Sequence, residues 1–346
     1  MWVSAVFCTA IAFGENVLGV RYNNRDSGST MSYISEALHP KAALLYAGVC
    51  VLASFGIGNM TQTNALAAAA SEIGISCKAS GLVTALLCGS VIFRGAKKVA
   101  SAAEKIIPLM SLLYIGASLI VIVIFRNNIM DVLKTIFTSA IGYSQVIGGI
   151  SGTAIKKAVS VGLRRGIFSN EAGMGSSVLV HTETDCSEPV RMGMWAVVEV
   201  VIDTIICCSM TAFVILLTGA DSSGGEGLAV AAEGFRRGLG EYAGYFIAGS
   251  AIIFAFCTLL GWYFYGEKCL LYIVRNGSPK IPLLLYRAAY TAAAFIGAVS
   301  SLEIIWGTAD IFNWILMVIN LTAVIVLNKE IVKSTENYTN SIINKK

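Results

Sequence analysis

Charged residues are scarce in this sequence. Asp, Glu, Lys and Arg make up 13% of the 346 residues, whereas roughly 25% is usual for a soluble domain. Hydrophobic residues account for 56%, and the mean hydropathy is +0.72. This deficit of charge excludes a disordered chain, a nucleic-acid-binding domain and a disulfide-rich secreted module. The class that remains is an all-α polytopic membrane protein.

Signals for other kinds of protein are also missing. The nine cysteines form no CxxC pair and fall mostly in apolar runs, as small buried side chains do. No basic stretch precedes the first apolar run, so a signal peptide is not expected. The two histidines, His39 and His181, lie far apart in predicted loops, and no hydrolase, zinc-protease or nucleotide-binding motif occurs in a fitting context. We therefore expect neither an enzyme nor a cofactor.

Nine stretches have the apolar character of membrane-spanning helices, which need about 20 residues to cross roughly 30 Å of hydrocarbon. The third of them is short and the fifth is rich in glycine. They are residues 2–20, 42–70, 80–93, 106–125, 133–153, 193–217, 243–265, 282–302 and 308–327.

The distribution of basic residues gives an orientation. Loops after the odd-numbered spans, taken with the first residues of the spans that follow them, contain 20 of the 25 Lys and Arg residues, and those after the even-numbered spans contain 5. Because basic residues favour cytoplasmic loops, we expect a plasma-membrane protein whose residues 331–346 form a cytoplasmic tail. Met1 then lies on the outer side.

The second span carries polar residues where a simple anchor would be apolar. Gly56, Gly58, Asn59 and Gln62 fall near its middle, and Asn59 and Gln62 are expected on one helix face because they are three residues apart. One interpretation is close packing between helices. The other is a polar lining for a transported solute.

A glycine-rich stretch, residues 145–177, interrupts the fifth span. Gly148, Gly149 and Gly152 weaken a continuous helix, which is tolerated in a membrane only inside protein or beside a cavity. The following FSNEAGMGSS, residues 168–177, is expected as a loop on the inner face. Ser169 there is expected to cap a short helix that has Glu171 in its first turn.

Five acidic residues fall within the predicted spans or next to them: Glu15, Glu199, Asp203, Glu303 and Asp310. Ionisable groups at such depth are costly and suggest function. Glu199 and Asp203 are four residues apart, so they are expected to share a helix face and either bind a cation or share a proton. The alternative is that each acid pairs with a Lys or Arg near the membrane surface.

Thr258, in the middle of the seventh span, is a candidate sodium ligand. Sodium is a hard cation, and hard cations prefer carbonyl, hydroxyl and carboxylate oxygens. The alternative is a hydroxyl that donates to a carbonyl of its own helix.

Several stretches together resemble the alanine or glycine:cation symporter family, the sodium:alanine symporters. They are RGIFSNEAGMGSS, FGIGNMTQTN, TLLGWYFYGEK and WGTADIFNWILMVINLTAVIVL, which occur here in the family's arrangement between Met1 and about residue 330. The resemblance implies an inverted-repeat amino-acid transporter fold. It also implies symport of sodium with alanine or glycine by alternating access.

The resemblance also assigns roles to residues. Gly56, Gly58, Asn59 and Gln62 match a polar motif of the family's substrate site, in which Gln62 is expected to contact the amino group. Thr258 is expected to bind sodium, and Glu199 and Asp203 are expected as coupling or structural acids.

Members of this family begin well upstream of the position that matches Met1. The resemblance therefore implies that residues 1–330 form a transporter domain lacking its first two helices, with nine of eleven present. Two alternatives stay open: a fragment that inserts without transporting, and a variant coupled to protons. A passive channel is disfavoured because no filter motif is present.

Overall fold

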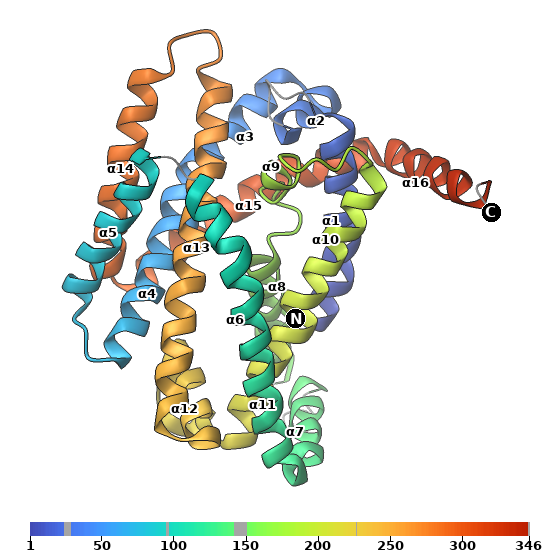
Figure 1. Cartoon of the computed structure of the whole chain (residues 1–346). Helices are drawn as coiled ribbons and strands as arrows, with labels where there is room; N and C mark the ends of the chain where they lie inside the picture. Colours follow the sequence, from blue (N-terminus) through green and yellow to red (C-terminus); the bar gives the residue numbers. More distant parts are fainter. Residues whose placement is uncertain (24–28, 95–96, 142–150, 226, 345–346) are drawn as a thin grey trace.

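The computed structural model of this chain describes residues 1–23, 29–94, 97–141, 151–225 and 227–344, and these residues form helices without a β-strand (Figure 1). Within them, side chains are described except at 94, 97–105, 140, 141, 151–158, 302–306 and 308. The α-helices are α1 (Trp2–Arg21), α2 (Ser29–Ala37), α3 (Pro40–Ala53), α4 (Thr61–Glu72), α5 (Cys77–Arg94), α6 (Lys97–Ile124), α7 (Ile129–Ile141), α8 (Ser151–Asn170), α9 (Val178–His181), α10 (Pro189–Val200), α11 (Cys208–Thr218), α12 (Leu228–Leu239), α13 (Glu241–Ile273), α14 (Lys280–Val299), α15 (Leu302–Val326) and α16 (Asn328–Ile343).

Seven helical segments in the described residues are long and apolar enough to cross a membrane. They are Trp2–Arg21, Pro40–Glu72, Ile106–Ile124, Pro189–Thr218, Glu241–Ile273, Lys280–Val299 and Ala309–Val326. A helix satisfies its backbone polar groups internally, which is the condition for lying in lipid. The predicted class, an all-α polytopic membrane protein, is confirmed.

Two of the nine predicted spans are not among the helices long and apolar enough to cross a membrane. The predicted span 80–93 lies in α5, whose apolar part Cys77–Phe93 is shorter than the seven segments. The predicted span 133–153 is not a single helix over its described residues, because α7 ends at Ile141 and α8 begins at Ser151. Its middle, 142–150 with Gly148 and Gly149, lies outside the described residues. The 13 residues of α7 extend only about 20 Å, less than the hydrocarbon thickness.

Two of the long spans change helix type near their middle. The span Pro40–Glu72 contains the π-helix η1 (Ser54–Met60), and the span Pro189–Thr218 contains the π-helix η4 (Val201–Cys207). A π-helix forms i→i+5 hydrogen bonds and rotates the residues after it relative to those before. Such segments are frequent at functional sites, and the predicted continuous helices did not include them.

Helix α13 runs the length of the bundle between α4 and α6 (Figure 1). It packs against α3, η1, α4 and α12, and its Trp262 is among the largest fully buried side chains. Gly58 in η1 lies directly against the Trp262 side chain. The glycine is therefore required by the close approach of η1 to α13.

The predicted tail is largely helical. Helix α16 continues from α15 after one residue, Leu327, and packs against α1 and α10. Arg21 Nε lies 2.7 Å from Glu330 Oε2, and the Tyr22 hydroxyl donates to the same oxygen at 2.8 Å. These contacts hold the first turn of α16 to the end of α1.

We predict that Gly58→Ala destabilises the protein, because a Cβ there would lie 2.0 Å from Trp262 Cβ. Overpacking of this kind typically costs about 1–3 kcal/mol. The matched control is Gly261→Ala in α13, where a Cβ meets nothing within 4 Å. Thermal unfolding of the purified protein in detergent should show a lower midpoint for Gly58→Ala alone; equal midpoints would contradict the prediction.

Candidate functional site

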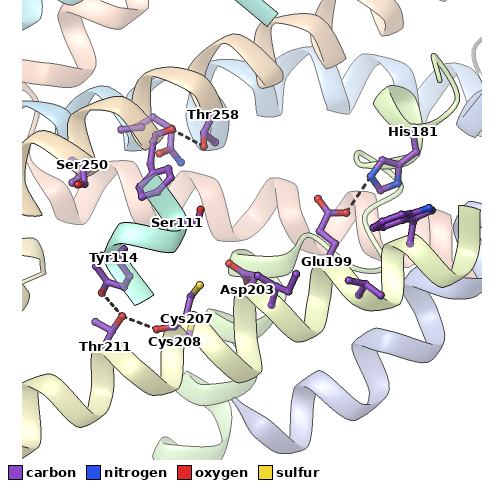
Figure 2. Close-up of a pocket in the computed structure, with 18 of the residues that line it drawn as sticks. Ser111, Tyr114, His181, Glu199, Asp203, Cys207, Cys208, Thr211, Ser250 and Thr258 are labelled. Carbon is purple, nitrogen blue, oxygen red and sulfur yellow. Dashed lines mark hydrogen bonds and ion pairs between the residues drawn. The ribbon is translucent and has the colours of Figure 1, made fainter. Parts of the chain in front are cut away.

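A cavity of about 1350 Å³ lies among the helices of the bundle. Its walls come from α4, α6, α12, α13 and the broken helix α10–η4–α11, with the segment after α9 at one end (Figure 2). The walls are mostly apolar, with polar side chains at intervals. The polar residues in the lining include Gln62, Ser111, His181, Glu199, Asp203 and Thr258.

Four of the predicted site residues line this one cavity. Gln62 is in the first turn of α4, directly after η1, and Asp203 is in η4. Glu199 comes from α10 and Thr258 from α13. The side-chain amide of Gln62 makes no hydrogen bond to another described residue, so its donor and acceptor are available to a solute.

The other three residues of the polar motif lie away from the cavity lining. Asn59 is fully buried and its amide donates to the Tyr290 carbonyl at 2.7 Å. Gly58 packs under Trp262, and the nearest side chain to Gly56 is that of Phe312. Asn59, within η1, therefore bonds to α14, whereas Gln62, two residues after the end of η1, lines the cavity.

The Thr258 hydroxyl donates to the Phe254 carbonyl at 3.1 Å, within its own helix. This is the bond expected if the threonine were only a helix residue. The bond uses the hydroxyl hydrogen, however, and leaves oxygen lone pairs at the cavity wall. The contact is therefore compatible with the predicted role toward sodium.

Asp203 is held by hydroxyl groups. Its Oδ2 accepts from Ser169 Oγ at 2.6 Å and from Thr204 Oγ1 at 2.9 Å. No Lys or Arg lies within ion-pair distance of Asp203 in the part of the chain that the structure describes. The alternative of pairing with a basic residue at the membrane surface does not apply to this acid.

Glu199 pairs with His181, which was not among the predicted site residues. Its Oε2 lies 3.1 Å from His181 Nε2 (Figure 2). The other ring nitrogen, Nδ1, lies 2.8 Å from Asn16 Oδ1, and the Asn16 amide nitrogen donates to the Ala12 carbonyl. This last bond orients the Asn16 amide so that its Oδ1 faces the ring.

The other three acids named from the sequence are Asp310, Glu303 and Glu15, and the two with described side chains have different kinds of partner. Asp310 lies 3.6 Å from Arg164, as the ion-pair alternative expected. The side chain of Glu303 lies outside the described part of the structure. Glu15 is fully buried and bonded to an asparagine and a backbone N–H rather than to Lys or Arg.

The predicted inner-face loop 168–177 is non-helical from Glu171 to Ser177, and its part 169–176 is packed inside the bundle. Met174 and Ser176 are fully buried. Helix α8 extends through Ser169 to Asn170, so Ser169 does not cap a helix, and Glu171 lies after α8 rather than in a first turn. The correction has a physical reason: other helices supply partners for the polar groups of this segment, so it needs no water.

Glu171 connects this segment to α13. Its carboxylate accepts from Trp262 Nε1 at 2.8 Å and from Ser176 Oγ at 2.7 Å. Its φ of 53° is the one left-handed non-glycine backbone in the described residues, a costly conformation that the surrounding packing maintains. Glu171 lies outside the seven spans, and burial raises the pKa of its carboxyl to about 7.

The segment 169–176 therefore contacts η4 directly and is linked to η1 through Trp262. Glu171 holds Trp262, which packs on Gly58 of η1. Ser169 bonds to Asp203, and the Asn170 amide donates to Thr204 at 3.1 Å, both in η4. The sequence pattern predicted a loop on the inner face for this segment. The sequence feature that could have indicated its irregular backbone is the pair Gly173 and Gly175, which both adopt positive φ.

We predict that Glu171→Ala lowers the free energy of unfolding by about 1–3 kcal/mol, because it leaves the buried Trp262 N–H and Ser176 hydroxyl without their acceptor. Glu183→Ala is the matched control, since Glu183 also contacts α13 through Lys268 but is 53% exposed. An exposed pair contributes at most about 1 kcal/mol. Denaturant titration should rank the two variants in this order, and the reverse order would contradict the assignment.

Comparison with known proteins agrees with this helical architecture. The sodium:alanine symporter family matches residues 1–346. An uncharacterized transporter of Haemophilus influenzae is 37% identical over 349 residues, which cover 98% of this chain and 75% of the relative. The sodium/alanine symporter AgcS of Methanococcus maripaludis is 33% identical over 98% of this chain and 76% of its own length. The probable sodium/glutamine symporter GlnT of Bacillus subtilis is 32% identical over 98% of this chain and 71% of its own length.

Proposed function

Because this chain belongs to the sodium:alanine symporter family, we propose that it carries a small neutral amino acid together with sodium across the plasma membrane by alternating access. The substrate and ion meet in the cavity between α4, α13 and the broken helix α10–η4–α11. The excess of Lys and Arg in alternate loops supports a cytoplasmic C-terminus.

One observation carries this proposal. Two spans interrupt their α-helical course beside the same cavity, and each presents a polar side chain to it there: Gln62 after η1 and Asp203 within η4. Broken or irregular helices in a membrane are tolerated where they line a cavity, and transporters use them to bind solutes.

The chemistry of these side chains suits an amino-acid zwitterion. Its ammonium group needs acceptors and its carboxylate needs donors. The Gln62 amide offers both, with its oxygen facing the amino group, and Asp203 adds negative charge on the opposite wall. Ala65 and Ala251 in the same walls leave room for a short apolar side chain. These features favour alanine or glycine.

Thr258 supplies a hydroxyl oxygen for sodium on the α13 wall. A hard cation takes such oxygens readily, and the Glu199 and Asp203 carboxylates make the cavity attractive to positive charge. Each sodium ion that enters gains roughly 2.3 kcal/mol per 100 mV of membrane potential. One or two ions per cycle are therefore sufficient to drive accumulation of the amino acid.

Uptake of radiolabelled alanine into proteoliposomes tests the proposal. An inward sodium gradient should raise uptake several-fold over equal sodium on both sides, because the ion gradient drives the cycle. A proton gradient without sodium serves as the comparison, and stimulation there alone would indicate proton coupling. Equal uptake under all three conditions would refute sodium symport.

Gln62→Leu should abolish alanine binding while membrane insertion stays normal, because leucine keeps the apolar bulk and removes the donor and acceptor. The matched control is Asn64→Leu, two residues further along α4. Asn64 donates to the Gly297 and Ser300 carbonyls, so its loss affects stability rather than alanine affinity. Binding measured by isothermal calorimetry separates the two, and wild-type affinity in Gln62→Leu would remove Gln62 from the site.

A further inference from the structure

Glu15 is a carboxylate buried in a membrane span without a basic partner. It lies in α1, and its side chain is fully inaccessible to solvent. Oε2 accepts from the Gly173 N–H at 3.2 Å and from Asn320 Nδ2 at 2.8 Å. Oε1 is equally buried and has no hydrogen-bond partner among the described residues.

The surroundings hold this carboxylate in one orientation. The Asn320 amide nitrogen also donates to the Gly173 carbonyl at 2.9 Å, and the Tyr33 hydroxyl donates to Asn320 Oδ1. These two bonds fix which end of the amide faces Glu15. Glu15 Oε2 is therefore occupied on a rigid support, whereas Oε1 keeps its lone pairs.

Several charged side chains on the elements packed against α1 are engaged elsewhere. Arg21 pairs with Glu330 of α16, Arg164 of α8 pairs with Asp310 of α15, and His181 of α9 pairs with Glu199 of α10. In η4, Asp203 is bonded to Ser169 and Thr204, and α2 contributes the Tyr33 hydroxyl. Glu15 has no Lys, Arg or His within 4 Å in the described parts of the chain.

An isolated carboxylate is strongly disfavoured in such a place. A buried charge without a partner costs several kcal/mol even after the protein relaxes, and a bridging water satisfies a lone pair without balancing the charge. A small positive charge on Oε1 corrects this imbalance.

We propose that Glu15 Oε1 binds a monovalent cation, either a proton or sodium, at a site separate from the cavity. Both ligands have the same chemistry here, a single positive charge small enough for an enclosed carboxylate oxygen. The site adjoins the segment 169–176 through Gly173, and that segment reaches Asp203 through Ser169. Occupancy at Glu15 therefore acts on the support of the cavity wall.

Infrared difference spectroscopy of the purified protein in liposomes tests this site directly. In one arm, sodium chloride replaces choline chloride at constant pH; in the other, pH is stepped at constant choline chloride without sodium. A carboxylate stretch that shifts on adding sodium identifies sodium. A protonated carboxyl band that is lost as pH rises identifies a proton. Glu15→Gln should lose that band, because the amide keeps the acceptor for Gly173 and Asn320 and removes the charge.

Two further variants make the result specific. Glu330→Gln removes another carboxylate that contacts α1 and should leave the band unchanged. Glu15→Asp retains the charge and should shift the band rather than abolish it, which gives a readout even if Glu15→Gln fails to fold. Identical spectra for the wild type, Glu15→Gln and Glu15→Asp in both arms would overturn the proposal. The spectra need no alanine, so failure of sodium-driven uptake leaves this test intact.

Discussion

The hydrogen bond from Trp262 to Glu171 joins the parts of this protein that matter most to one another. It ties α13, the longest α-helix in the described residues, to a non-helical segment in the middle of a helical bundle. In a membrane protein such a segment is stable only when its polar groups find partners within the protein. Glu15, Tyr46, Trp262 and Asn320 provide them from four different helices.

The two π-helices extend the same constraint to the cavity. The segment 169–176 contacts η4 directly, at Asp203 and Thr204, and is linked to η1 through Trp262, which packs on Gly58. A π-helical turn has less favourable hydrogen-bond geometry than an α-helical one, so contacts outside the helix have to stabilise it. The same local irregularity turns Gln62 toward the cavity and Asn59 away from it.

The few acidic residues of this chain have two kinds of partner, depending on where they lie in the bundle. Near helix ends, acids pair with basic residues, as Glu330 does with Arg21 and Glu72 with Arg236. Deeper in the bundle, Glu15, Glu171 and Asp203 are held by neutral donors instead. A neutral donor stabilises a carboxylate without cancelling its charge, so this interior keeps a net attraction for cations.

Composition and hydropathy alone determined the class of this protein and most of its spans, because burial in lipid demands long apolar helices with few charges. The motif from Gly56 to Gln62 and the pair Glu199 and Asp203 also stood out, since polar groups in such helices are costly. The sequence did not determine which of them meet. Only the tertiary structure brought Gln62 and Asp203 to the walls of one cavity, buried the segment 169–176, and gave His181 and Trp262 their acidic partners. Those contacts join residues far apart in the chain, and a π-helical turn changes side-chain direction in a way that α-helical spacing does not reveal.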